Sequence, residues 1–256
     1  MVLAVDIGNT NIVLGCFGEN KILFRERVST SQTATDLEYA VMIKNALDMN
    51  GLSATDIDGA VMSSVVPSVT NTVRKAVNKL CGVSTLVVGP GVKTGLHIKI
   101  DNPAQLGSDL VVDAVAGINS YPLPLIIIEM GTATTFSVID RNKNYVGSLI
   151  TTGMAVSTDA LISRTAQLPR ISFDAPKKLI GTNTVDAMKS GIMSFNAAGI
   201  DGVVDRIEGE LGEKCTVVAT GGLSVLVAPL CKREIILDDD LLLKGLMYIY
   251  SKNCEG

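Results

Sequence analysis

The sequence predicts an α/β protein of two halves related by internal duplication, each with a mixed sheet flanked by helices, and with a cleft between the halves. The first reason is a repeated pattern. An acidic residue, a spacer, glycine and polar residues ending in threonine follow a buried-type strand at residues 6–10 and again at 129–134. The second reason is the order of the elements, because strands precede helices in both halves.

The first half is expected to begin with three strands and to continue with helices and further strands. Apolar and β-branched residues between turn signals predict the strands, and apolar residues at helical spacing from Leu37 to Leu47 predict the first helix. The expected strands are 2–7, 10–17, 20–28, 58–66 and 84–88. The expected helices are 35–49, one after Pro67, and 106–119, which joins the two halves.

The second half repeats this order. Its expected strands are 124–129, 134–140, 144–151 and 215–219. Its expected helices are 154–165, 184–212 and 240–252. Strands first and helices after, twice over, describe two RNase-H-like domains. With a boundary near Gly117, the expected domains are 1–117 and 118–256.

The composition argues against several classes of function. Among 256 residues there are 22 basic and 26 acidic side chains, a net charge of −4, 4% aromatic residues and no tryptophan. A chain without a basic run or many stacking aromatics is not expected to bind nucleic acid. No apolar stretch reaches the ~18–20 residues that span a bilayer, so no membrane contact is expected either.

The cysteines and the histidine narrow the chemistry further. Five cysteines are scattered along the chain without a CxxC pair. That pattern is typical of reduced thiols, so we expect a cytoplasmic protein. His97 is the single histidine, which argues against a histidine-based catalytic triad and against a zinc site that needs two imidazoles.

Asp6, Gly8, Asn9 and Thr10 form the first candidate site. Gly8 has no Cβ to keep backbone N–H groups away from phosphate oxygens, and Asn9 and Thr10 add side-chain donors. Asp6 can hold Mg²⁺ directly or through water. The same residues also fit an ordinary hairpin turn. The second copy favours a ligand, because two such turns suit the phosphates and metal ion of a nucleotide, and a phosphotransferase is the first hypothesis.

Three further segments have both a structural and a functional interpretation. Asp109, after Gly107 and Ser108, fits a helix cap better than a catalytic base from spacing alone. Residues 220–222 fit either a strand-to-helix turn or a nucleoside or phosphate site at a helix N-terminus. Residues 181–184 fit either an N-cap or a ligand contact.

With these segments in order, the chain resembles the type III pantothenate kinases of the acetate and sugar kinase/Hsp70/actin superfamily, which have an actin-like ATPase fold. The resemblance extends nearly from end to end. The matching motifs are residues 6–10, 101–103, 107–109, 129–134, 168–169, 181–184, 190–191, 220–222, 240–241 and 245–246. Each motif is weak alone, and their shared order is what points to the family.

The resemblance implies transfer of the γ-phosphoryl group of ATP to the primary hydroxyl of pantothenate, the first step of coenzyme A synthesis. It implies that Asp109 is the base, that Asp6 holds Mg²⁺ through water, and that Glu129 holds a monovalent cation, K⁺ or NH₄⁺. The implied ATP contacts are Asp6, Ile7, Gly8, Asn9, Thr10, Asn11, Ile12, Val13, Thr132, Gly221 and Gly222. The implied substrate contacts are Ile100, Gly107, Ser108, Asp109, Leu110 and Thr184. The family forms homodimers, so Thr184 would reach the ligand of the neighbouring chain.

Four positions depart from the family pattern. Leu110 stands in place of an arginine, Ile100 in place of a tyrosine that contacts substrate, Glu129 in place of an aspartate and Thr152 in place of a proline. Loss of a buried charged hydrogen bond costs about 2–5 kcal/mol, and two or three such losses could abolish activity on pantothenate. Two alternatives to a pantothenate kinase therefore follow from these substitutions. One alternative is an enzyme that phosphorylates another, less anionic hydroxyl compound. The other is a non-catalytic paralogue that binds nucleotide or a partner and serves regulation.

Overall fold

The computed structural model describes residues 1–19 and 21–254, so the expected strand start at residue 20 lies outside the described residues. The chain forms two compact units. Unit 1 combines Met1–Leu96, Asp101–Asn119 and the chain from Asp240 onward, and unit 2 combines His97–Ile100 and Ser120–Asp239. Neither unit is continuous in sequence, since the last helix belongs to unit 1 and His97–Ile100 belongs to unit 2. The expected domains 1–117 and 118–256 stay a prediction of where the two duplicated segments begin and end.

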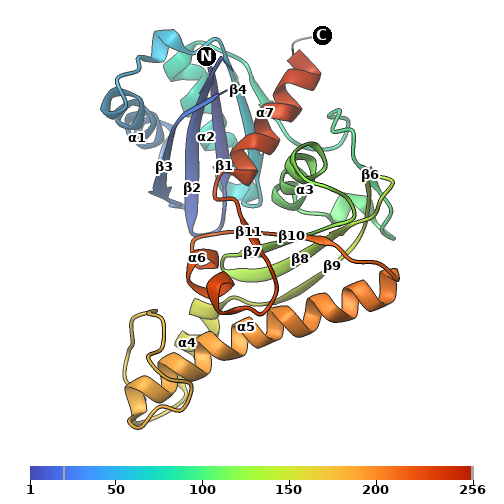
Figure 1. The fold of residues 1–256 in the computed structure, drawn as a ribbon. Coiled ribbons are helices and arrows are strands. Elements are labelled where there is room, and N and C mark those ends of the chain that lie inside the picture. The colour runs from blue at the N-terminus through green and yellow to red at the C-terminus, as the bar shows by residue number, and fades with distance from the viewer. Residues whose placement is uncertain (20, 255–256) are drawn as a thin grey trace. The chain divides into compact units, whose positions relative to one another are not determined.

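Unit 1 contains a five-stranded sheet in the order β3-β2-β1-β4-β5 (Figure 1). Its strands are β1 (Val2–Ile7), β2 (Asn11–Gly18), β3 (Lys21–Ser29), β4 (Gly59–Ser64) and β5 (Thr85–Val87). The central strand β1 pairs antiparallel with β2 and parallel with β4. Apart from Asp6, β1 is a continuous apolar run, as a strand covered on both faces requires.

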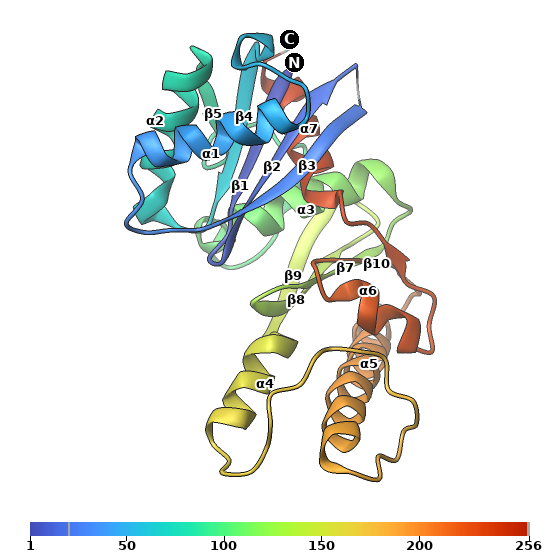
Figure 2. The ribbon, with the colours of Figure 1, turned by 90° about the vertical axis from the view of Figure 1, so that its left-hand side faces the viewer.

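One face of this sheet packs against α1 (Asp36–Met49) and α2 (Pro67–Cys81). Figure 2 shows α1 lying across the strands. Helix α1 starts at a capping box between Thr35 and Glu38, which satisfies backbone N–H groups of its first turn. Helix α2 starts with a proline at its first position and ends at Gly82 in the left-handed conformation. These local signals explain why the expected helices lie where the sequence predicts them.

The other face of the sheet packs against α7 (Leu241–Cys254), which comes from the far end of the chain. A Cβ on Gly15 would lie 2.7 Å from Leu243 Cδ1, and a Cβ on Gly59 would overlap the Tyr250 hydroxyl. Helix α3 (Ser108–Ser120) meets α7 equally closely, since Gly245 lies against the Val112 backbone. Glycines in β2, β4 and α7 therefore allow α7 to join unit 1.

Unit 2 contains a six-stranded sheet in the order β11-β10-β7-β8-β9-β6. Its strands are β6 (His97–Ile98), β7 (Leu125–Met130), β8 (Ala133–Ile139), β9 (Asn144–Thr152), β10 (Thr216–Thr220) and β11 (Ile236–Leu237). Strand β7 pairs antiparallel with β8 and parallel with β10, as β1 does with β2 and β4. Strands β7 to β11 thus repeat the connectivity of β1 to β5, and the predicted internal duplication is present in the topology.

The helices of unit 2 are α4 (Met154–Ser163), α5 (Thr184–Leu211) and the short α6 (Ser224–Val227). Buried side chains of α5 pack with β7, β8 and β10 in one apolar core. The sequence did not predict β6, β11 or α6, because segments of two to four residues carry no periodic pattern. Short 3₁₀ helices occur at Ala54–Asp56, Pro103–Gln105 and Ala228–Leu230. Among the described residues, no helix has the length and apolar character needed to cross a bilayer.

Candidate active-site elements in the two units

The first glycine turn joins β1 to β2 in unit 1, and backbone hydrogen bonds hold it in one conformation. Gly8 N donates to Asn11 O at 3.0 Å, and a Cβ on Gly8 would lie 3.0 Å from that same oxygen. Thr30 Oγ1, directly after β3, donates to Gly8 O at 2.7 Å and also holds the turn. Asn9 and Thr10 are exposed. The turn thus presents polar side chains and a glycine backbone to solvent, as a phosphate contact requires.

Asp6 lies at the carboxyl end of β1, next to Ser63 of β4 in the parallel register. Its side chain is buried, and Ser63 Oγ donates to Asp6 Oδ1 at 2.5 Å. Burial raises the pKa of Asp6 to about 7; the Ser63 hydrogen bond opposes this rise, and the charge of Asp109 adds to it. A carboxyl group held in this way is poised to accept a cation that would compensate its buried charge.

Asp109 lies in the first turn of α3, and two serines fix that turn to the end of β4. Ser108 Oγ donates to Ser64 O at 2.9 Å and accepts from Ser64 N at 3.1 Å. Asp109 Oδ1 accepts from Leu110 N at 2.8 Å, so the side chain folds over the start of its own helix. A Cβ on Gly107 would overlap that carboxylate oxygen. Asp109 therefore accepts a backbone hydrogen bond within the first turn of α3, and its role as a base stays a prediction.

The surroundings of Asp109 favour the protonated form of its carboxyl group. Burial raises the pKa of Asp109, against the lowering effect of the backbone N–H groups of Leu110 and of Asp109 itself. Asp6 and Asp109 are close enough for one charge to raise the pKa of the other. Unit 1 therefore brings together two carboxyl groups from the ends of β1 and α3, each with a pKa above its usual range.

The expected substrate contacts are divided between the units. Gly107, Ser108, Asp109 and Leu110 belong to unit 1, whereas Ile100 and Thr184 belong to unit 2. Leu110, at the position where the resemblance leads us to expect an arginine, is 8% exposed and thus largely withdrawn from solvent. Thr184 is exposed at the first turn of α5, behind the N-cap Asn183.

The second glycine turn, in unit 2, joins β7 to β8, and three segments meet there at backbone distance. Gly131 N donates to Ala133 O at 2.9 Å, and Gly153 N donates to Thr132 O at 3.1 Å. A Cβ on Gly153 would overlap the carbonyl oxygen of Gly131. Gly221, after β10, has a φ of +91°, and a Cβ there would lie 2.6 Å from Met130 O. Side chains larger than hydrogen are therefore excluded at Gly153 and Gly221.

Glu129 lies at the carboxyl end of β7 with a threonine on each side. It is in register with Thr220 of β10 and with Thr135 of β8. The Thr135 hydroxyl is buried and has no hydrogen-bond partner among the described residues. A carboxylate beside an unsatisfied hydroxyl forms an oxygen donor set that suits a hard cation. The residues at this position therefore fit the monovalent cation that the resemblance implies.

The remaining expected ATP contacts lie at the two glycine turns, in the strands beside them and in the turn after β10, and they differ in exposure. Asn11, Thr132 and Gly222 are exposed, Val13 and Gly221 are half-buried, and Ile7 and Ile12 are core residues that can offer only backbone atoms. Ser224 Oγ donates to Gly221 O at 2.7 Å, which fixes the turn after β10. Among the described residues, no group of three or more His, Cys, Asp or Glu side chains is placed to hold a metal ion.

Sequence reasoning missed two polar residues of these sites. Ser63 holds the Asp6 carboxyl, and Thr135 offers its hydroxyl beside Glu129. Each is a small polar residue in a strand that also supplies apolar core residues, and that mixture was the available signal. The role of each residue depends on strand register, which cannot be predicted from a single sequence.

Comparison with known proteins adds independent evidence. The sequence model of one family, described as type III pantothenate kinase, matches residues 2–206. A type III pantothenate kinase of Halalkalibacterium halodurans is 42% identical over 253 residues, which is 99% of this chain and 100% of that protein. One from Bacillus cytotoxicus is 44% identical, over 99% of this chain and 97% of that protein.

A solved structure supports the fold. The activator of the 2-hydroxyisocaproyl-CoA dehydratase from Clostridium difficile, with bound ADPNP, aligns with a TM-score of 0.58 at 15% identity. The alignment covers 97% of this chain and 93% of that one. At this identity the likeness concerns the fold alone.

Proposed function

This chain belongs to the type III pantothenate kinase family, and we propose on that premise that it transfers the γ-phosphoryl group of ATP to the hydroxyl group of pantothenate. The observation that carries the proposal is similarity over the whole length of two such kinases. The arrangement in unit 1 agrees with it, because the Asp6 and Asp109 carboxyl groups lie near one another beside a glycine turn with exposed polar side chains.

Asp109 is our proposed base. Phosphoryl transfer depends mainly on positioning and on charge stabilisation, and the protein itself has to accept one proton from the attacking hydroxyl. The raised pKa of Asp109 makes it a stronger proton acceptor than an ordinary aspartate. Ser108 holds the first turn of α3 against β4, so the base has a fixed position.

We assign ATP binding to residues 6–13, Thr132, Gly221 and Gly222. Asn9, Thr10, Thr132 and Gly222 are exposed at these turns, and the side chains of Asn9 and Thr10 add donors for phosphate oxygens. Asp6 would hold Mg²⁺ through water, and the ion would neutralise charge on the phosphates when bound. Glu129, with Thr135 and Thr220 beside it, would hold K⁺ or NH₄⁺.

We assign the acceptor site to Gly107, Ser108 and Leu110 of unit 1 and to Ile100 and Thr184. Leu110 offers neither charge nor hydrogen bond to an acceptor carboxylate. That observation favours the second candidate, an enzyme of this family whose best acceptor is a less anionic hydroxyl compound.

We further propose a homodimer in the cytoplasm. Three apolar side chains of unit 2 are largely exposed and suit contact with a second copy: Ile150 at 70%, Leu179 at 74% and Ile180 at 80%. Thr184, four residues after Ile180, would then reach the ligand of the neighbouring chain. All five cysteines are free thiols, which agrees with a reducing compartment.

ATP turnover by the purified protein tests the proposal. We would measure ADP release with pantothenate, with a panel of neutral and anionic hydroxyl compounds, and without acceptor. We expect release that depends on pantothenate and falls on the order of 10²–10⁴-fold in Asp109→Asn. Faster turnover with a neutral acceptor would support the second candidate. Nucleotide binding without turnover on any acceptor would overturn both and leave a non-catalytic role.

A further inference from the structure

The end of β4 connects the first glycine turn to the helix that carries Asp109. Val65 N, directly after β4, donates to Ile7 O at 3.0 Å, so this end is joined to β1 beside the turn. Ser64, the last residue of β4, uses both its N–H and its C=O for the Ser108 hydroxyl, at 3.1 and 2.9 Å. The place of Ser64 therefore fixes where the first turn of α3, and with it Asp109, lies.

The side chain of Ser64 is held in turn by the start of α2. Ser64 Oγ accepts from Val66 N at 3.1 Å. Thr70 Oγ1 donates to Ser64 Oγ at 2.7 Å, and Val66 O lies 2.9 Å from the same hydroxyl. Ser64 and Thr70 are half-buried, so their hydrogen bond competes less with water than an exposed one. Thr70 is thus linked through Ser64 to Ser108.

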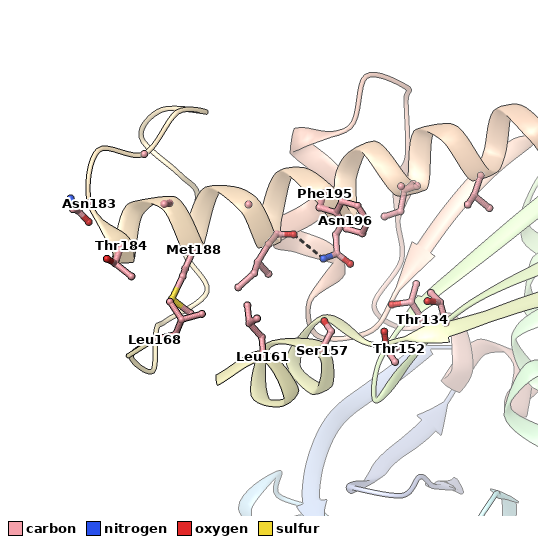
Figure 3. Close-up of a pocket in the computed structure, with 18 of the residues that line it drawn as sticks. Thr134, Thr152, Ser157, Leu161, Leu168, Asn183, Thr184, Met188, Phe195 and Asn196 are labelled. Carbon is pink, nitrogen blue, oxygen red and sulfur yellow. Dashed lines mark hydrogen bonds between the residues drawn. The ribbon is translucent and has the colours of Figure 1, made fainter. Parts of the chain in front are cut away.

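Hydrogen bonding within α2 alone does not account for Thr70. A polar side chain in a helix often donates to the carbonyl oxygen four residues before it. Asn196 of α5 does so with Ile192 O at 2.8 Å (Figure 3, dashed line, beside the cavity that α4 and α5 line). Thr70 has the same relation to Val66. Its shorter contact is with the hydroxyl of Ser64, outside α2, and a bond within the helix does not require it.

The corresponding joint of unit 2 has a glycine where unit 1 has Ser64. The residue paired with the acidic residue of the glycine turn is Ser63 in β4 and Thr220 in β10. The next residue is Ser64 in unit 1 and Gly221 in unit 2. A glycine offers no side chain for a following helix to hold. The linked hydroxyl groups therefore belong to the unit that carries the proposed base.

We propose that Thr70 is a positioning residue for Asp109. Its hydroxyl fixes the first turn of α3 through Ser64 and Ser108. The proposal rests on the proposed function, because the place of Asp109 matters for turnover only if its carboxylate accepts the proton of the acceptor hydroxyl. Thr70 itself is not assigned to ATP, to the acceptor or to a metal ion.

Steady-state kinetics of Thr70→Val test this role, since valine keeps the shape of the side chain and removes the hydroxyl. We expect kcat for ADP release with the preferred acceptor to fall about tenfold. A displacement of ~1 Å costs on the order of 10²-fold, and the bonds between Ser64 and Ser108 remain in the variant. The KM values for ATP and acceptor should change less than about twofold, because a base acts in the transition state. Thr70→Ser keeps the hydroxyl and should restore kcat.

Thr85→Val is the matched control. The Thr85 hydroxyl is hydrogen-bonded to the Asn78 side chain at 2.6 Å, near the other end of α2. The variant therefore loses a hydrogen bond to the same helix, away from Ser64. Its kcat and both KM values should equal those of the parent. Circular dichroism and thermal unfolding check that every variant is folded.

Amide hydrogen exchange measures the same link without any turnover. The Ser64 amide donates to Ser108 Oγ, so its exchange rate reports the contact between β4 and α3. We expect this rate to rise about fivefold in Thr70→Val, the scale of one neutral hydrogen bond, and to stay unchanged in Thr85→Val. If the parent has no turnover on any acceptor, the proposed function fails, and the exchange rate alone decides whether Thr70 holds α3.

Four results would overturn the positioning role. An unchanged kcat in Thr70→Val of an active parent would mean that the hydroxyl does not act on Asp109. An equal loss of kcat in Thr85→Val would trace the effect to α2 as a whole. A change in KM without one in kcat would mean that Thr70 affects substrate binding instead. Equal exchange of the Ser64 amide in the parent and in Thr70→Val would remove the link itself.

Discussion

The two glycine turns share a sequence pattern but are built in different ways. In unit 1, hydrogen bonds from Thr30 and to Asn11 hold the turn, and the acidic residue before it is buried against Ser63. In unit 2, the turn is held by backbone contact with two other segments, and the acidic residue before it lies between two threonines. Hydrogen bonds hold both turns, and the second is in addition closely packed against Gly153 and Gly221.

This difference separates two tasks that a duplicated motif can perform. Buried Asp6 keeps a raised pKa, so its carboxyl group gains from a cation that arrives with the substrate. Glu129 lies beside Thr135 and Thr220 in the sheet, and we propose that it holds a monovalent cation. Duplication therefore supplied two similar backbones, and the neighbouring residues gave each its chemistry.

Asp6→Asn is expected to give the largest change in stability. The pKa of Asp6 is about 7 in the folded protein, and its ordinary value, which applies in the unfolded chain, is 3.8. As pH rises, the unfolded chain therefore loses this proton before the folded protein does. Stability is thus fully retained below pH 4 and falls up to about pH 7. Asparagine has no proton to lose, so without Mg²⁺ the variant should be about 3–4 kcal/mol more stable at pH 8. Urea unfolding between pH 4 and 8 measures this.

Ser63→Ala is the matched control for that prediction. The hydroxyl of Ser63 stabilises the charged carboxylate, so its loss should steepen the fall in stability between pH 4 and 8. For Asp6→Asn, we expect activity to fall although stability rises, because the variant loses the proposed Mg²⁺ contact. Parallel stability curves for the parent and Asp6→Asn would mean that Asp6 is not protonated by burial.

The sequence predicted the larger elements and the two turns, but not the polar neighbours of each turn. Apolar runs and helical spacing placed β1, β7 and α5 close to their observed bounds, because β1 and β7 are apolar runs that end at turn residues and α5 is long. The membership of α7 in unit 1 could not be predicted, since it depends on glycine contacts between distant segments. The roles of Ser63 and Thr135 likewise depend on which residues become neighbours across a sheet.

Replacement of glycines by alanine tests whether the second turn is more closely packed than the first. Gly221→Ala should cost about 2–3 kcal/mol, because φ is +91° and the new Cβ would lie 2.6 Å from Met130 O. Gly8→Ala should cost about 1 kcal/mol, because its Cβ would meet Asn11 O at 3.0 Å. Gly147→Ala, where a Cβ meets nothing within 4 Å, is the control and should change little. Equal losses at Gly8 and Gly221 in thermal unfolding would contradict a difference between the turns.

Thr135→Val should give the smallest effect and the most specific one. Without K⁺, removal of a buried hydroxyl that has no partner should stabilise the protein by about 1 kcal/mol. With K⁺, the parent should gain stability while Thr135→Val gains less, because one oxygen donor beside Glu129 is gone. Thr134→Val is the control: its hydroxyl also lacks a partner, but the residue is not in register with Glu129. It should be stabilised to a similar degree and keep the full response to K⁺.

Unfolding in KCl and in choline chloride distinguishes the two variants. An identical K⁺ response in both would place the cation elsewhere than beside Thr135.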